Sequence, residues 1–315
     1  MPSADFEIIR YNPSMKKDWD LFVEKSKNAT FLFNRDYMDY HSDRFTDNSL
    51  LFFRKGKLYA MLPASRAGET LFSHQGLTYG GLIMSNKCSA EGILDLFSYL
   101  LQYLKTEGVK RLVYKPVPYI YHTIPSQEDL YALFRFNAIL SIRNISSTID
   151  IPYRLNFAKD RRAAVRKAEN HRISVTNSSN PEPFWKILEN NLKTKYSATP
   201  VHTLDEMKRL MDLFPDNIKL FTAFNDDGVL AGVVCYICGT TVHTQYISAS
   251  PEGKEFGAVD FIIKHLLEVV FKDFRYLDLG TSNENNGRIL NESLIYQKQG
   301  FGGRAICYDT YELRI

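Results

Sequence analysis

The sequence predicts an α/β protein of the α+β kind, with two similar domains in tandem, each a mixed and mostly antiparallel sheet flanked by helices. Two observations lead to this prediction. A length of 315 residues favours two domains over one. The same order of elements (strand, strand, strand, helix, strand) occurs once in each half of the chain. We place the division at Asp150, which gives an N-terminal domain of residues 1–150 and a C-terminal domain of residues 151–315.

The first two strands of each half form a predicted hairpin. "SLLFFRKGKLYAMLPAS" turns at Lys55-Gly56, and "IKLFTAFNDDGVLAGVVCYI" turns at Asp227-Gly228. A turn of this composition between two β-rich runs is a strong hairpin signal. A third β-rich run follows in each half, "LFSHQGLTYGGLIMS" in the first and "TTVHTQYISAS" in the second.

A helix and a further strand complete each half. The apolar residues of both helices recur at i, i+3, i+4, i+7 and i+11, which is typical of a helix lying on a sheet. They are Ile93, Leu96, Phe97, Leu100 and Leu104 in the first half, and Val259, Ile262, Ile263, Leu266 and Val270 in the second. The short runs "VKRLVYK" and "FRYLDLG" are the strands that follow. We interpret this repeated order as a duplication.

Composition narrows the class of protein and its expected location. A net charge of +3 with interspersed charges excludes a highly basic nucleic-acid coat protein. No apolar run approaches the ~20 residues of a membrane span, and "MPSADFEIIRY" does not resemble a signal peptide. Four cysteines in so long a chain indicate a reducing compartment, so we expect a cytoplasmic protein. The lone CxxC of Cys235 and Cys238 has no second ligand pair, so no metal site is expected.

Several segments resemble one family. "KDRRAAVRKAENHRISV" (159–175), "YISASPEG" (246–253), "YLDLGTSN" (276–283) and "YQKQGFGG" (296–303) resemble the second domain of FemABX-like proteins, which are tandem GNAT-fold acyltransferases of the FemAB-like or Acetyltransf_6 type. "WDLFVEKSKNATFLFNRDYMDYHSDRF" and "SHQGLTYGG" are similar to the first domain of bacterial FemAB-like proteins. The resemblance covers nearly the whole chain. It implies a first domain that binds the acceptor and a second that binds the acyl donor.

The resemblance implies three alternative functions. The first is a FemAB-like acyltransferase that moves an acyl or aminoacyl group to an amine of a peptidoglycan or polysaccharide precursor, or of a related sugar or peptide. The second is an acetyl-CoA-dependent N-acetyltransferase acting on a small soluble amine. The third is a non-catalytic ligand-binding module on the same scaffold. Nothing in the sequence indicates the oligomeric state.

The donor implied by the resemblance is an acyl-CoA such as acetyl-CoA, with aminoacyl-tRNA as the alternative. A long charged heptad segment, able to form the helical arm of some Fem transferases, is absent from the sequence, so tRNA has no support from that feature. The family's CoA signature has its nearest match in "KEFGA", with lysine in the first position. A helix N-terminus with a nearby glycine suits a diphosphate. The candidate cofactor-binding residues are Gly253, Lys254, Gly257 and Ala258.

Acyl transfer to an amine needs a group that removes a proton and a group that polarises the acyl carbonyl. His74 is suited to proton transfer near neutral pH, and Asp278 or Glu284 is a possible base. Lys298 is the expected electrostatic partner of a diphosphate or of a developing oxyanion. These four residues are the catalytic candidates.

Six residues are candidates for substrate binding. The glycines of "SHQGLTYGG" would let an acceptor approach the main chain beside a tyrosine, and Tyr246 is suited to hydrogen-bond the acyl group or the leaving thiol. Arg161 falls on the apolar side of a basic helix, so it needs a carboxylate, phosphate or backbone partner. We favour a role as anion ligand in a cleft between the domains over pairing with a protein carboxylate. The candidates are Tyr79, Gly80, Gly81, Arg161, Arg162 and Tyr246.

Overall fold

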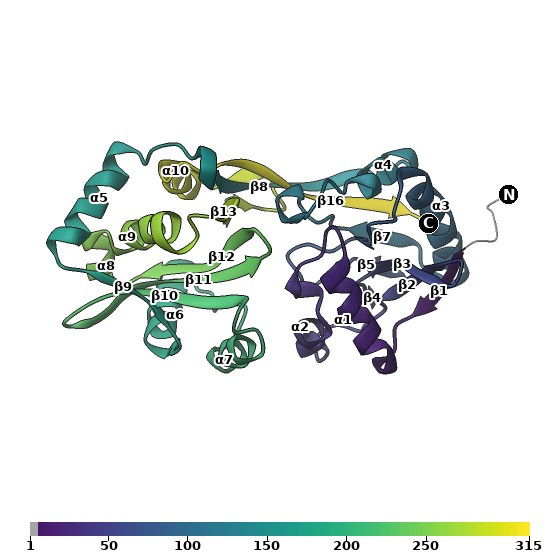
Figure 1. The fold of residues 1–315 in the computed structure, drawn as a ribbon, viewed down its shortest axis with the longest axis horizontal. Helices are drawn as coiled ribbons and strands as arrows, with labels where there is room; N and C mark the ends of the chain where they lie inside the picture. The colour runs from purple at the N-terminus through teal and green to yellow at the C-terminus, as the bar shows by residue number, and fades with distance from the viewer. Residues whose placement is uncertain (1–5) are drawn as a thin grey trace. The chain divides into compact units, whose positions relative to one another are not determined.

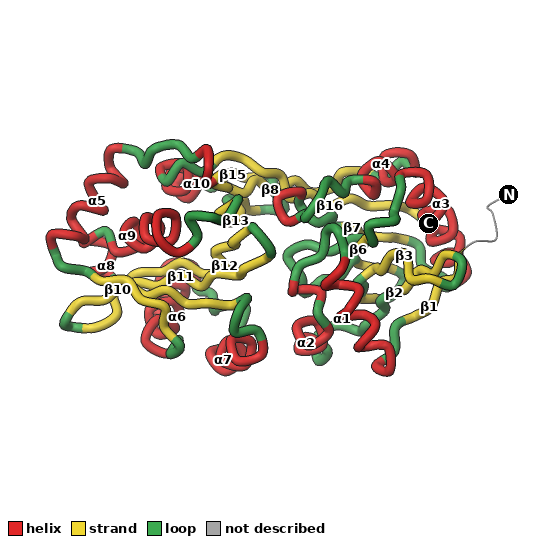
Figure 2. The backbone as a smooth tube through the Cα atoms, in the orientation of Figure 1, coloured by secondary structure: helices red, strands yellow, loops and turns green. Residues whose placement is uncertain are grey.

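The computed structural model describes residues 6–315, apart from the side chains of His41 and Tyr196. The chain forms two compact units, each built of sheet and helix (Figures 1 and 2). The first comprises Met1–Asn144, Asn285–Ile289 and Cys307–Ile315, and the second comprises Ile145–Glu284 and Leu290–Ile306. The predicted fold class is therefore confirmed.

The units differ from two continuous halves divided at Asp150. The last strand, β16 (Arg304–Arg314), begins in the second unit and ends in the first. Its final residues pair antiparallel with β7 (Arg111–Tyr114), and Leu313 is buried in the core of the first unit. Pairing between strands so far apart in the chain has no local sequence signal, which is why the C-terminal residues were assigned to the second domain.

The first unit contains a four-stranded antiparallel sheet in the order β1-β2-β3-β6. A second group of strands has the order β4-β5-β7-β16. The elements, in chain order, are β1 (Phe6–Arg10), α1 (Lys16–Lys25), α2 (Arg35–Met38), β2 (Leu50–Arg54), β3 (Lys57–Leu62), β4 (Ser65–Ala67), β5 (Thr70–Phe72), β6 (Ile83–Met84), α3 (Ala90–Thr106), β7, α4 (Glu128–Arg135) and the start of β8 (Ile139–Asp150).

The predicted hairpin and helix of the first unit are confirmed. Lys55 and Gly56 form the turn between β2 and β3, both with positive φ. Helix α3 begins after Ser89, whose hydroxyl accepts a hydrogen bond from the Gly92 amide and so caps the helix. All five residues of its predicted stripe are at most 1% exposed. The stripe is therefore the side of α3 that packs into the core.

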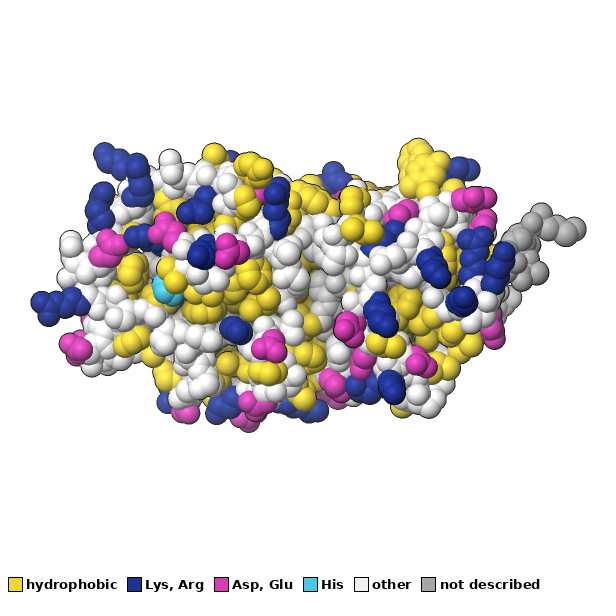
Figure 3. All heavy atoms as spheres, viewed as in Figure 1, with side chains coloured by type: hydrophobic (Ala, Val, Ile, Leu, Met, Phe, Trp, Pro, Cys, Tyr) yellow, Lys and Arg dark blue, Asp and Glu magenta, His cyan; other side chains and the backbone are white. Residues whose placement is uncertain are grey.

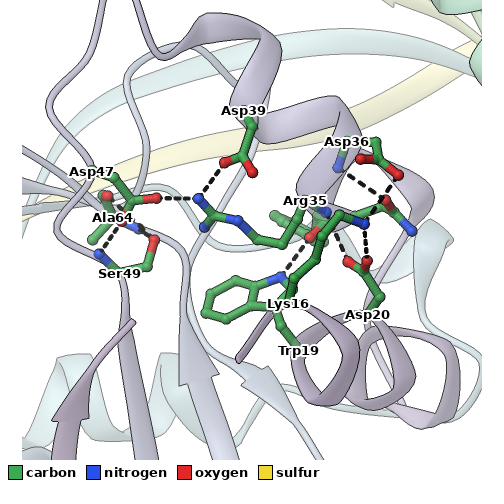
Figure 4. Close-up of polar contacts among 11 residues, drawn as sticks. Lys16, Trp19, Asp20, Arg35, Asp36, Asp39, Asp47, Ser49 and Ala64 are labelled. Carbon is green, nitrogen blue, oxygen red and sulfur yellow. Dashed lines mark hydrogen bonds and ion pairs between the residues drawn. The ribbon is translucent and has the colours of Figure 1, made fainter. Parts of the chain in front are cut away.

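Part of the first unit is held by ion pairs around a buried arginine (Figure 4). Arg35 is at the start of α2, and its guanidinium pairs with both Asp39 and Asp47. Its plane also lies over the ring of Tyr11, with the guanidinium carbon 3.8 Å from the ring centroid. Lys16 forms a separate, more exposed pair with Asp20 at 2.7 Å.

The run from Ser73 to Ser85 is mostly loop, so the prediction of one continuous strand there is wrong. Strand β5 ends at Phe72, and β6 covers only Ile83 and Met84. The loop is fixed by a hydrogen bond of 2.8 Å from the Gly80 amide to the carbonyl of Lys115. A Cβ at Gly80 would lie 1.9 Å from the carbonyl oxygen of Ser73, so close backbone packing explains this glycine.

The second unit contains a six-stranded arrangement in the order β8-β13-β12-β11-β10-β9. Neighbouring strands are antiparallel, except β12 and β13, which are parallel. Its elements are the end of β8, α5 (Lys159–Asn170), β9 (Ser174–Ser178), α6 (Glu182–Tyr196), α7 (Leu204–Leu213), β10 (Ile218–Asn225), β11 (Gly228–Cys238), β12 (Thr241–Ala249), α8 (Pro251–Phe256), α9 (Ala258–His265), β13 (Tyr276–Thr281), β14 (Asn283–Glu284), β15 (Ile289–Leu290, whose first residue belongs to the first unit), α10 (Glu292–Gly300) and the start of β16.

Helices cover both faces of this sheet. In Figure 1, α9 lies against one face, and α6 and α7 lie against the other. Ile262, Ile263 and Leu266 belong to the same buried cluster as Val233 and Val242 of the sheet. On the opposite face, a Cβ at Gly232 would lie 2.3 Å from the ring of Phe184 in α6. The sheet is thus packed between helices on its two faces.

Candidate active site

Strands β12 and β13 separate within the second unit. Their parallel pairing covers three positions, from Thr241 opposite Tyr276 to His243 opposite Asp278. Beyond this pair the pairing stops, although β12 continues to Ala249. The register of β13 against β8 shifts after Asp278. The register of β12 against β11 shifts between Thr244 and Tyr246, shortly after His243. Such bulges end strand pairing and re-aim side chains, often beside active sites.

A pocket of about 240 Å³ is lined by the separated strands and by the helices beside them. Much of its wall is apolar, and its polar side chains include three lysines. The apolar residues include Leu188, Ile247, Val259, Leu279, Leu294 and Phe301, and the polar ones include Asn191, Lys195, Ser248, Lys254, Gln297 and Lys298. A ligand with an apolar chain and an anionic group matches this lining.

Asp278 is completely buried and receives several hydrogen bonds. Its Oδ1 accepts from the hydroxyl of Ser146 at 2.5 Å and from that of Thr148 at 2.8 Å, both on β8. Its Oδ2 lies 2.8 Å from Nδ1 of His243 on β12. A carboxylate can be buried in this way because donors compensate for the water it has lost.

Lys298 reaches the same place from α10. Its side chain is buried, and its Nζ donates to the carbonyl of Gly280 at 2.9 Å and to that of Thr281 at 2.8 Å. Burial lowers the pKa of Lys298 to about 8, against an opposing influence of Asp278. An ammonium has three N–H groups, so two carbonyls leave one of them for a ligand. Because Lys298 lines the pocket, this group is available at its wall.

Gly280 brings His243 and Lys298 close together. The residue has a φ of 79°, which favours glycine. A Cβ at this position would lie 3.4 Å from Cε1 of His243 and 3.9 Å from Nζ of Lys298. The imidazole and the ammonium therefore flank the same backbone position at the point where the strands separate.

Two of the four catalytic candidates, Asp278 and Lys298, thus meet in one cluster. Sequence reasoning missed His243, because its importance comes from its register opposite Asp278. Glu284 does not join the cluster through a hydrogen bond or ion pair. It is exposed in β14, where its carboxylate accepts a hydrogen bond from Asn291 at 2.9 Å.

Tyr246 is used for internal packing. Its hydroxyl lies 2.6 Å from Nδ1 of His202, and its ring meets that of Trp185 edge to face at 5.3 Å. Burial raises the pKa of Tyr246 to about 12. The residue does not line the pocket, although the next residue, Ile247, does. The predicted contact with the acyl group stays a prediction.

The predicted diphosphate-binding segment forms helix α8. The Gly253 amide donates to Ser250, which caps the helix, and a Cβ at Gly253 would lie 2.2 Å from the carbonyl oxygen of Leu230. A Cβ at Gly257 would lie 2.4 Å from the carbonyl oxygen of Ala164. Both glycines are therefore explained by close packing, and Ala258 is also buried.

Lys254 is the member of this segment that lines the pocket, where its Nζ donates to Asn191 at 2.8 Å. It is therefore the one of the four candidate cofactor-binding residues whose side chain is placed to meet a ligand there.

Arg161 pairs with protein carboxylates, contrary to the role we favoured. Its guanidinium lies 3.1 Å from Asp160 and 3.1 Å from Asp260. Such pairs satisfy an arginine on the partly apolar side of a helix, so an anionic ligand is not needed. Arg162 is exposed and, with Arg154 and other residues, lines a second pocket of about 320 Å³.

His74 and Tyr79 are interior residues of the first unit, each 3% exposed. The ring of His74 meets that of Phe45 edge to face, and the Tyr79 hydroxyl donates to Thr30 at 3.2 Å. Gly81, with a φ of 76°, packs so closely on Tyr114 that a Cβ would lie 2.8 Å from its ring. In this conformation the predicted residues His74, Tyr79, Gly80 and Gly81 are buried and offer little surface to an acceptor, contrary to expectation.

The described residues contain neither a metal-binding cluster nor a helix suited to cross a membrane. Within residues 6–315, no group of three or more histidine, cysteine or acidic residues is placed to hold a metal ion. Over the same residues, none of the helices combines the length and the apolar character that crossing a membrane requires. On the face shown in Figure 3, basic and acidic side chains are interspersed.

Known proteins provide an independent comparison. Residues 155–286 match the family described as acetyltransferase (GNAT) domain. No curated protein sequence matches the chain significantly. The crystal structure of FemX is similar over 98% of this chain and 97% of its own, with a TM-score of 0.70 and 11% identity.

Two further structures are similar. One is the C-terminal domain of a putative lysylphosphatidylglycerol synthetase from Agrobacterium fabrum, with a TM-score of 0.62 and 9% identity over 96% of this chain and 92% of that one. The other is a tandem GNAT protein from the clavulanic acid biosynthesis pathway, with a TM-score of 0.50 and 10% identity over 98% of both chains. At such identities the likeness concerns the fold. Residues 155–286 therefore match a GNAT acetyltransferase domain, and the chain as a whole shares the fold of FemX and of a tandem GNAT protein, which together support acyltransferase chemistry.

Proposed function

We propose that this chain transfers an aminoacyl or acyl group from an activated donor, held in the pocket between β12 and β13, to an amine of a cell-envelope precursor or a related sugar or peptide. The observation that carries the proposal is the position of Lys298. Its ammonium is fixed by two carbonyls, and it lines the pocket at the place where the two strands separate.

The pocket supports a donor with an apolar or extended part. Leu188, Ile247 and Val259 would contact that part, while Lys195 and Lys254 would meet an anionic group. The acyl carbonyl would then lie at Lys298, whose remaining N–H would stabilise negative charge on its oxygen. In the reaction, the amine nitrogen forms a bond to the acyl carbon, the bond to the leaving sulfur or oxygen breaks, and one proton passes from nitrogen to the leaving group.

Two donors are consistent with these features. The likeness to FemX and to a protein named for lysylphosphatidylglycerol synthesis favours an aminoacyl donor, with aminoacyl-tRNA as its carrier. The match to an acetyltransferase domain favours acetyl-CoA and a small amine as the second candidate. In both cases the same pocket holds the activated acyl group.

Donor binding can be tested with a pair of substitutions on α10. Leu294 lines the pocket, whereas Tyr296 is 65% exposed and does not. Leu294→Trp should weaken binding of the donor at least tenfold by filling the pocket, and Tyr296→Trp should leave it unchanged. Binding of acetyl-CoA and of aminoacyl-tRNA should be measured separately by titration, together with transfer of labelled acyl group to amine acceptors.

The outcomes separate the alternatives. Binding and transfer with acetyl-CoA alone would select the second candidate, and with aminoacyl-tRNA alone the first. If neither donor binds, or if Leu294→Trp binds the donor as well as Tyr296→Trp does, the proposed function of the pocket is wrong.

A further inference from the structure

The pair formed by His243 and Asp278 has a defined orientation. Nδ1 of His243 lies 2.8 Å from Oδ2 of Asp278. The other oxygen of Asp278 is held by Ser146 and Thr148, so the carboxylate is fixed from β8 while the imidazole comes from β12. Because both partners are on paired strands, their relative position is set by backbone register.

This orientation determines which nitrogen can accept a proton. An ionised carboxylate only accepts hydrogen bonds, so Nδ1 of His243 must carry the hydrogen. In the neutral imidazole, Nε2 is then the acceptor. It makes no hydrogen bond with any residue that the structure describes, and the side chain is 16% exposed. Its lone pair is therefore open to a ligand.

Asp278 itself is poorly placed to accept a proton from a ligand. Its exposed fraction is zero, and both oxygens already accept hydrogen bonds. Asp278 is therefore better suited to orient the imidazole than to act as the possible base that the sequence suggested. The charged groups beside the imidazole are Asp278 itself and Lys298, which lies on the other side of Gly280.

We propose that His243, oriented by Asp278, takes the proton from the acceptor amine during acyl transfer. The proposal rests on the proposed function, because the donor must occupy the pocket lined by Lys298. Nε2 of His243 accepts one proton from the nitrogen as the new carbon–nitrogen bond forms. The bond to the leaving thiolate or alkoxide breaks, and the proton returns from His243 to that sulfur or oxygen, so that no proton or electron is left over.

The geometry around Gly280 supports separate roles for Lys298 and His243. Lys298 provides positive charge for the acyl oxygen, and His243 provides a proton acceptor, both within 4 Å of one point beside that residue. The two groups approach from α10 and from β12. A carbonyl held by one group can thus be attacked by an amine that meets the other.

Single-turnover transfer with saturating donor tests the role of His243. His243→Gln should lower the transfer rate about 10²- to 10⁴-fold, the range expected when a general base is lost. The dissociation constant of the donor should change less than about threefold, because His243 does not line the donor pocket. In His243→Ala, added imidazole should restore part of the rate. His265→Gln, in α9, is the matched control and should keep the wild-type rate.

The orientation can be measured without turnover. In ¹⁵N-histidine-labelled protein, the signals of His243 are those missing from His243→Gln, and they should show the hydrogen on Nδ1. Asp278→Asn should shift the tautomer towards Nε2–H and lower the transfer rate. If that variant does not fold, Thr148→Val, which removes one hydroxyl held by Asp278, should give a smaller change in the same direction.

Failure of this inference differs from failure of the proposed function. A wild-type protein that neither binds donor nor transfers an acyl group refutes the proposed function. A protein that binds and transfers, while His243→Gln keeps its rate within about threefold or His243 carries its hydrogen on Nε2, refutes the role of His243 alone.

Discussion

Nζ of Lys298 lies 2.9 Å from the carbonyl oxygen of Gly280, in the segment of β13 where pairing with β12 has ended. Lys298, on α10, therefore satisfies a backbone carbonyl of β13 beyond the point where β13 pairs with β12. The same contact places positive charge at the wall of the pocket, so Lys298 links the local strand geometry to the proposed chemistry.

Replacement of Lys298 should separate catalysis from binding. Lys298→Met keeps an unbranched apolar side chain but removes the charge, so the rate of acyl transfer should fall about 10- to 10³-fold. Donor affinity should change far less, because most of the wall is untouched. Steady-state kinetics at saturating donor provide the measurement. An unchanged rate would show that Lys298 serves only to hold the backbone.

The stability of the protein should depend on pH through Lys298. Its pKa is lowered by burial from 10.5 to about 8 in the folded state. Below pH 8 the lysine is charged in both states, and its burial opposes folding. Between pH 8 and 10.5 only the unfolded state retains the proton, so the free energy of unfolding should rise, by on the order of 3 kcal/mol. Comparison of denaturant unfolding in wild type and Lys298→Met over this range isolates the effect, and parallel curves would contradict it.

A buried acid in the first unit, Asp129, should make the free energy of unfolding fall, not rise, with increasing pH. Asp129 accepts a hydrogen bond of 2.7 Å from Tyr114, and burial raises its pKa from 3.8 to about 6. Below pH 3.8 both states are protonated, and between pH 3.8 and 6 only the folded state keeps the proton. The associated stability is therefore lost as the pH rises to 6, by on the order of 2–3 kcal/mol. Equilibrium unfolding should show that the free energy of unfolding of Asp129→Asn increases relative to that of the wild type as the pH rises from 3.8 to 6. If the difference between the two free energies stays constant over this interval, the pKa of Asp129 is not raised.

The segment of α8 provides a test of packing against ligand binding. Gly253→Ala should lower the melting temperature by several degrees, because its Cβ would meet the carbonyl of Leu230. Lys254→Met should leave the melting temperature nearly unchanged but weaken donor binding, because Lys254 lines the pocket. Thermal unfolding and donor titration of both variants distinguish the two effects. The reverse result would restore Gly253 as a ligand-binding glycine.

Local patterns predicted much of the fold. The turn at Lys55-Gly56 and the stripe of α3 depend on neighbouring residues, so the sequence contains their whole signal. The pairing of β16 with β7 depends on residues far apart in the chain and was missed. The same distinction explains the site, since Asp278 and Lys298 were identified as polar residues in short motifs, but His243 acquires its partner only through strand register.

The glycines of the candidate site residues were the weakest basis for predicting ligand binding. In both "SHQGLTYGG" and "KEFGA" it was interpreted as room for a ligand beside the backbone. The structure places a carbonyl oxygen in that space, from Ser73 at Gly80 and from Ala164 at Gly257. Ligand approach and close packing require the same missing Cβ, so a glycine alone does not distinguish them.

The cluster in Figure 4 leads to a final prediction. The side chain of Arg35 is 3% exposed, and its guanidinium pairs with Asp39 and Asp47 while lying over Tyr11. Arg35→Met would remove both ion pairs and the stacked cation, so unfolding should become easier by about 2–4 kcal/mol. Arg35→Lys should not fully restore this loss, because an ammonium lacks the planar cation that lies over the ring of Tyr11.

Lys16 provides the matched control for Arg35. It also contacts two carboxylates, those of Asp20 and Asp36, but its side chain is 41% exposed. Solvent weakens such pairs, so Lys16→Met should cost less than about 1 kcal/mol. Urea unfolding of the variants gives the comparison directly. Equal losses at Arg35 and Lys16 would show that burial does not strengthen the Arg35 pairs, and that the stacked arrangement over Tyr11 contributes little to the stability of the first unit.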